Sequence, residues 1–149
     1  MEIITHQGLI KRDAWQLNTD DERHAASHEI LSLERWCKWR EEVAFPIAPL
    51  ITGDDAFEEL AVGLTSVPLI AVSFPNLTDG RGYSIAYALR KHYRFAGDLR
   101  AIGDIQRDQM AYLVRAGFSS FEIDHDQHAE DLIRGLTDTF SHAYQTAVA

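Results

Sequence analysis

The chain has 149 residues, of which 46% are hydrophobic and 25% are charged, and its formal net charge is −9. This length fits one domain and is too short for a complete eight-unit α/β barrel, which needs about 250 residues. The composition is that of a globular protein, and no apolar run in the sequence is long enough to cross a bilayer. So acidic a chain is a poor partner for nucleic acid or for an anionic membrane surface.

The start of the chain and its cysteine content indicate a cytoplasmic protein. Residues 1–13 lack the basic start and the apolar stretch of a signal peptide. Cys37 is the single cysteine, so it forms no internal disulfide, which fits a reducing compartment. It lies beside Trp36 on an apolar helical stripe, so we expect a buried and unreactive thiol.

Charge is distributed unevenly along the chain. Residues 41–80 contain seven acidic and no basic residues, whereas residues 81–115 contain seven basic and three acidic residues. Two interpretations stay open: the basic residues decorate the outer faces of two helices, or they form a local anion site or docking patch. These basic residues are Arg81, Arg90, Lys91, Arg94, Arg100, Arg107 and Arg115.

The first third of the chain predicts strands followed by one helix. Residues 3–17 have the pattern of a β-hairpin or edge pair around a turn, and residues 19–28 are polar and typical of a loop. Ser32 is a good N-cap, so a helix is expected to begin there and to continue to Val43 or Ala44.

Strands and helices alternate from residue 47 onward. Pro49 favours an edge position for the first of these strands, and Gly117 is placed to end a helix. Such alternation predicts parallel strands with right-handed crossovers. We therefore expect a single α/β domain over residues 1–149, a mostly parallel sheet with flanking helices (flavodoxin-like or partial-barrel-like) and an N-terminal β-hairpin or edge strand. The expected strands are 47–51, 68–74, 99–103 and 120–123, and the expected helical stripes are 57–64, 85–93, 110–114 and 129–147.

A ligand site is expected at the edge where the parallel strands end, because open α/β sheets bind ligands beyond the carboxyl ends of their strands. Four predicted loops form that edge. They are Thr52–Asp55, Pro75–Gly82, Gly103–Asp108 and Asp124–His128.

The loop before the second of these helices has features of an anion site. Gly80 and Gly82 would allow the main chain to approach a ligand, and Arg81 offers a bidentate fork at a helix N-terminus. The alternative is that Asp79-Gly80 is only a turn and that Thr78 or Asp79 is only a cap. The loop matches neither a Walker A motif nor G-x-G-x-x-G.

The third loop adds charged residues to the same edge. Asp104 either caps the following helix or, with Asp108, forms an ion pair that orients Arg107 or Arg81. The predicted anion or ligand site is therefore Thr78, Asp79, Gly80, Arg81, Gly82, Asp104, Arg107 and Asp108.

Other constellations are weaker signals. Asp79, Asp104 and Asp124 follow predicted strands and could converge on Mg²⁺, but aspartates at such places are ordinary caps, so we assign no metal. No G-x-S-x-G motif is present for nucleophilic catalysis. Two histidine pairs have zinc-like spacing but lie in loop-like segments, and we expect them to be exposed polar residues. The pairs are His24 with His28 and His125 with His128.

Residues 74–123 carry a family resemblance. They contain T-D-G-R-G-Y-S, then L-R-A-x-G-D, and then A-G-F-x-x-F. This stretch resembles a bacterial domain-of-unknown-function family whose members tend to be encoded beside assimilatory sulfite reductase and are often labelled oxidoreductases. The resemblance implies a role in sulfur assimilation and no particular mechanism. Ser73 and Ala116 stand where many members have an aspartate and a cysteine, which argues against a catalytic thiol at position 116.

Three functions remain open at this stage. The first is an accessory protein of assimilatory sulfite reduction that binds a small anion at the predicted site. The second is a non-catalytic adaptor that docks on a sulfite reductase subunit through residues 81–115. The third is an oxidoreductase with a bound nucleotide cofactor, for which the sequence has no dinucleotide fingerprint. The sequence identifies no cofactor.

Overall fold

The computed structural model describes residues 1–75, 80–123 and 128–137 as one α/β domain. Its centre is an eight-stranded sheet in the order β2-β1-β8-β7-β6-β5-β4-β3. Strands β3 to β8 pair in parallel, and β1 pairs antiparallel with both β2 and β8. The strands are β1 (Glu2–Thr5), β2 (Ile10–Arg12), β3 (Gln16–Leu17), β4 (Glu29–Ser32), β5 (Ile47–Ile51), β6 (Leu69–Phe74), β7 (Asp98–Gly103) and β8 (Ser120–Glu122).

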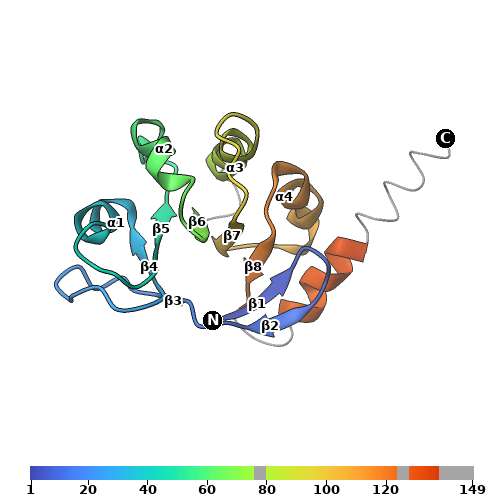
Figure 1. Ribbon diagram of the computed structural model, residues 1–149. Coiled ribbons are helices and arrows are strands. Elements are labelled where there is room, and N and C mark those ends of the chain that lie inside the picture. Colours follow the sequence, from blue (N-terminus) through green and yellow to red (C-terminus); the bar gives the residue numbers. More distant parts are fainter. Residues whose placement is uncertain (76–79, 124–127, 138–149) are drawn as a thin grey trace.

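The sheet curls like part of a barrel. From β3 to β8 each parallel strand lies beside its predecessor, so the order never reverses as it does in a flavodoxin-like sheet. The two edge strands, β2 and β3, are separated in the chain by Asp13–Trp15 only. Three residues span a short distance, so this link draws the two edges toward each other (Figure 1). The partial-barrel form of the predicted fold is therefore the one adopted.

The helices cover the convex side of this curled sheet (Figure 1). Residues 128–137 are also helical, and no helix among the described residues is long and apolar enough to span a membrane. The helices are α1 (Leu33–Trp39), the 3₁₀ turn η1 (Phe57–Leu60), α2 (Ala61–Leu64), α3 (Arg81–Lys91), the 3₁₀ turn η2 (Arg107–Gln109) and α4 (Met110–Ala116).

Both faces of the sheet bury apolar side chains. The larger cluster lies between the strands and the helices and includes Leu31, Val72 and Phe121. A smaller cluster on the opposite, concave face includes Ala71 and Ile102. Side chains alternate between the two faces of a strand, which explains the nearly continuous apolar pattern of β6.

Two expectations for the first half of the chain were wrong. The strand β4 was missed, because Ile30 and Leu31 are the only apolar pair between a polar loop and a helix start. Pro49 does not mark an edge strand, since β5 lies between β4 and β6. The ladder between β5 and β6 registers only from Leu50 onward, so the missing N–H of Pro49 precedes it.

The predicted helix start at Ser32 and the predicted helix end at Gly117 are confirmed, but the predicted end of the first helix is wrong. The Ser32 side chain accepts a hydrogen bond from the Arg35 backbone N–H at 3.3 Å and is the N-cap of α1, but this helix already ends at Trp39. Gly117 ends α4 with φ of 117°, as its position predicts. The last predicted helix is described only for residues 128–137, and its remainder lies outside the described residues.

Candidate functional site

The loops that follow the parallel strands meet at one edge of the sheet, which we call the carboxyl rim. Arg81 at the start of α3 donates to the Asp54 carboxylate in the loop after β5, at 2.7 Å. The Asp104 backbone N–H after β7 donates to the Phe74 carbonyl at the end of β6, at 2.8 Å. The His128 ring lies 2.8 Å from the Ile105 carbonyl. Each loop is thus tied to its neighbour.

Arg81 lies over the loop after β5. A Cβ atom at Gly53 would lie 2.3 Å from the Arg81 Nε, so glycine makes room for this side chain. The Arg81 and Asp54 side chains are 54% and 87% exposed, and such exposed pairs stabilise a protein by only about 0–1 kcal/mol. The ion pair between Arg81 and Asp54 is therefore a weak contact.

Arg107 turns the other way along the rim. Its Nη1 lies 3.9 Å from the Asp131 carboxylate in the C-terminal helix, and both side chains are about half exposed. Because β7 lies between β6 and β8, Arg81 and Arg107 are held by neighbours on opposite sides. The two guanidinium groups thus pair with carboxylates on different neighbouring elements.

Of the two predicted acidic residues of the third loop, Asp104 has a partner close in sequence. The Asp104 carboxylate accepts a hydrogen bond from the Gln106 side chain at 2.8 Å. The N-cap of η2 is Gln106, in a capping box with Gln109, so Asp104 is not the helix cap. Asp108 is exposed in the first turn of η2.

The two glycines of the second loop differ in their surroundings. A Cβ atom at Gly82 would meet the Phe74 ring at 2.5 Å, so close helix–strand packing explains this glycine. Gly80 faces open space, since a Cβ atom there would have no neighbour within 4 Å among the described residues. The predicted Thr78 and Asp79 lie outside the described residues.

The described residues contain no group of three or more His, Cys, Asp or Glu side chains arranged to hold a metal ion. Asp79, Asp124 and His125 lie outside that part of the chain. The His24 ring contacts Trp39 with ring centroids 5.1 Å apart. Cys37 is half-buried against the core, and this burial raises the pKa of its thiol.

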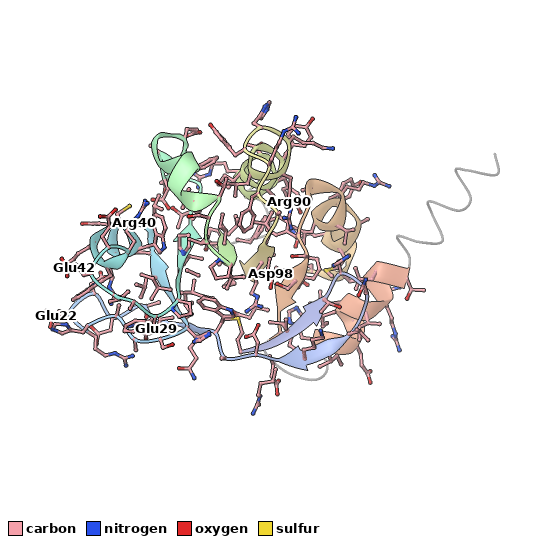
Figure 2. The ribbon with its side chains drawn as sticks, viewed as in Figure 1. Glu22, Glu29, Arg40, Glu42, Arg90 and Asp98 are labelled. Carbon is pink, nitrogen blue, oxygen red and sulfur yellow. The ribbon has the colours of Figure 1, made fainter. Side chains whose placement is uncertain are left out.

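Two of the seven basic residues in residues 81–115 fit neither interpretation, because their side chains make internal contacts. Arg100 lies in β7, and its side chain is 1% exposed. It shares a face with Ile102 and points to the concave side, where Asp13 and Asp98 accept its hydrogen bonds. Arg90 is half-buried and donates to three backbone carbonyls, at Phe95, Gly97 and Gly117. Figure 2 shows Arg90 between the ribbons of α3 and α4.

A groove between α3 and α4 was not foreseen from the sequence. It has a volume of about 720 Å³ and a mostly apolar lining. Tyr87 and Tyr112 on its walls are 52% and 61% exposed. These tyrosines lie on the otherwise polar faces of two amphipathic helices, and this position could have indicated a binding surface from the sequence. The lining residues are Tyr83, Ser84, Tyr87, Ala88, His92, Tyr112, Arg115 and Ala116.

Comparison with known proteins places the chain in a family. The model of the family described as "Bacterial protein of unknown function (DUF934)" matches residues 49–149. The chain belongs to the DUF934 family. The part matched by the DUF934 model begins in β5 and so includes the carboxyl rim and both helices of the groove. A search of curated proteins found no match.

Proposed function

We propose that this DUF934 protein is an accessory protein of assimilatory sulfite reduction that binds a small oxyanion at the carboxyl rim. The sulfite link rests on the resemblance of residues 74–123. The anion site is supported by one observation above all: Arg81 stands exposed at the start of α3, and its Asp54 partner is itself 87% exposed.

The chemistry of this end of α3 favours an anion. The first turn of the eleven-residue helix contains no acidic residue, and Gly80 at the N-cap has no side chain that would compete with an anion for the N–H groups of this turn. A sulfite or sulfate ion would accept hydrogen bonds from these groups and from the Arg81 guanidinium. Arg107 would contribute long-range attraction from its separate position on the rim.

Thermal unfolding with sulfite, sulfate or phosphate tests this site, against KCl at matched ionic strength. A ligand at a hundredfold excess over its Kd stabilises the folded state by about 2.7 kcal/mol. The expected result is a rise in Tm for the wild type that Arg81→Ala abolishes. Arg12→Ala is the matched control, since Arg12 is an exposed arginine that pairs with Glu2 in the N-terminal hairpin and not at the carboxyl rim. Equal shifts in all three proteins, or no shift, would contradict the proposal.

A second candidate function is an adaptor that docks on a sulfite reductase subunit. The groove between α3 and α4 favours it, because exposed tyrosines in a hollow are typical of protein contacts. Lys91 at the end of α3 and Arg94 shortly after it are exposed, whereas Arg90 is held by backbone carbonyls. Capture with purified reductase subunits should therefore fail for Lys91→Glu/Arg94→Glu and persist for Lys11→Glu, which changes charge on β2. Unchanged capture by the double variant would contradict this use of the patch.

A further inference from the structure

The groove between α3 and α4 has a floor, two walls and a fixed width. Ala88 and Ala116 are half-buried against the core and form its floor, because small side chains leave a hollow between larger neighbours. Tyr87 and Tyr112 stand above them, one on each helix.

Arg90 holds the two helices at this spacing. Its Nε donates to the Gly117 carbonyl after α4 at 2.9 Å, and its Nη1 donates to the Phe95 and Gly97 carbonyls after α3 at 2.9 and 2.8 Å. Charge-assisted hydrogen bonds to three carbonyls of two different connections resist opening of the groove. The hollow is thus a built feature of the fold.

The aromatic walls are already positioned for contact. The Tyr87 ring meets His92 edge-on with centroids 6.2 Å apart, and the Arg115 guanidinium lies 5.9 Å from the Tyr112 ring centroid. Rings held in this way lose little side-chain entropy when they bind, which is why tyrosine is enriched among residues that dominate binding energy. An exposed apolar hollow walled by such rings fits an inserted apolar side chain.

The basic residues near the groove favour a partner segment with acidic side chains. Arg115 is exposed in the lining of the groove, and Lys91 is exposed one helical turn after Tyr87 on α3. No acidic residue is found in the lining among the described residues. Lys91 and Arg115 also lie in the last turns of their helices, where cations offset the helix dipole. That role does not account for the exposed tyrosines beside them.

We infer that the groove between α3 and α4 is the docking site for an acidic segment of a partner protein that inserts an aromatic or large aliphatic side chain between Tyr87 and Tyr112. The carboxylates of this segment pair with Lys91 and Arg115. The inference rests on the adaptor candidate above and names the chemistry of its partner. It needs no anion at the carboxyl rim.

Site-specific photo-cross-linking in the native host tests the inference. A benzophenone side chain replaces Tyr87 or Tyr112, and replaces Leu9, which is 52% exposed on the hairpin, as the control position. Mass spectrometry identifies the attached peptides. The expected adduct is one peptide, rich in Asp and Glu with an apolar anchor, obtained from both groove positions and not from position 9.

Charge reversal then decides whether the adduct reports docking. Lys91→Glu/Arg115→Glu should reduce its yield at least tenfold, whereas Lys11→Glu should leave it unchanged. A peptide without acidic residues, a peptide of this same chain (residues 138–149 included), or no adduct would overturn the inference. An acidic peptide from a protein other than a reductase subunit would support the inference and would contradict the proposed link to sulfite reduction.

Discussion

Arg100 in the middle of β7 donates a hydrogen bond at 3.1 Å to Asp98, two residues earlier on the same face of the strand. The Arg100 side chain is 1% exposed, and that of Asp98 is 36% exposed. Asp98 also accepts from the hydroxyls of Ser119 and Ser120, at 2.6 and 2.8 Å. Figure 2 shows Asp98 within the curve of the sheet. A buried cation in the concave core is thus neutralised by carboxylates that reach the solvent.

This arrangement predicts that the Asp98 carboxylate contributes more to stability than the Arg100 guanidinium. Asp98→Ala leaves a buried guanidinium with one carboxylate fewer, removes the acceptor of the Ser120 hydroxyl and leaves Ser119 only the Leu99 carbonyl at 3.4 Å. We expect a loss of about 2–4 kcal/mol in the free energy of unfolding. Arg100→Met removes the desolvation cost of the cation and leaves partly exposed carboxylates behind, so its loss should be smaller. Urea unfolding measures both values. A larger loss for Arg100→Met than for Asp98→Ala would show that the cation is net stabilising.

Arg90 and Lys91 are neighbours in sequence, but we expect alanine substitution to lower the free energy of unfolding at Arg90 and hardly to change it at Lys91. Arg90→Ala removes hydrogen bonds to three backbone carbonyls, so we expect a loss of about 3 kcal/mol in the free energy of unfolding. Lys91→Ala should change it by no more than about 0.5 kcal/mol, because Lys91 is exposed. Arg90→Lys should restore only part of the loss, since an ammonium group cannot reproduce the planar fork. Equal losses for the two alanine variants would contradict the bridging role of Arg90.

The alternating half of the fold was predictable because each element carries its own local signal. The apolar run of β6 and the apolar stripe along α3 can each be recognised from their own residues, without the neighbouring elements. The strand β4 is not, since only its pairing with β3 and β5 makes four residues a strand. Curling is likewise non-local, because it depends on where β2 and β3 end up in the strand order.

The position of the loops at the carboxyl rim could be predicted from the sequence, but the partners of their side chains could not. Parallel strands bring their following loops to one edge, so Arg81 and Arg107 were expected there. Their partners Asp54 and Asp131 lie 27 and 24 residues away in the sequence, so the local pattern does not predict these ion pairs. Burial of Arg100 depends in the same way on Asp13, which lies at the other end of the chain.

Gly103 and Gly80 provide a matched pair of glycine substitutions at the rim. Gly103 has φ of 116°, and a Cβ atom there would lie 2.3 Å from the Phe74 carbonyl oxygen. Gly103→Ala should therefore destabilise the protein by more than about 2 kcal/mol, through both strain and a backbone clash. Gly80→Ala should be tolerated, because φ is −85° and the space is open. Circular dichroism melts of the two variants compare them, and a similar loss in both would contradict this distinction.

Tyr83 links the groove to the stability of the protein at alkaline pH. Burial raises the pKa of its phenol above the ordinary value of 10, and the charge of Asp108 raises this pKa further, whereas a hydrogen bond from Gln109 lowers it. Because the folded-state pKa is the higher one, the contribution of Tyr83 to stability is complete below about pH 10. It is then lost as the pH rises through the folded-state pKa. Urea unfolding between pH 8 and 11 should show a shallower loss for Tyr83→Phe than for the wild type.

Two further variants separate this titration from packing. Asp108→Asn should lower the pKa of Tyr83, which absorbance of the phenolate near 295 nm measures, because it removes the nearby negative charge. Tyr87→Phe removes a hydroxyl from an exposed ring on the same helix and is the control for loss of a phenol. If Tyr83→Phe and the wild type lost stability with the same slope, the burial of Tyr83 would not be coupled to folding. The tyrosine would then contribute only its surface to the groove.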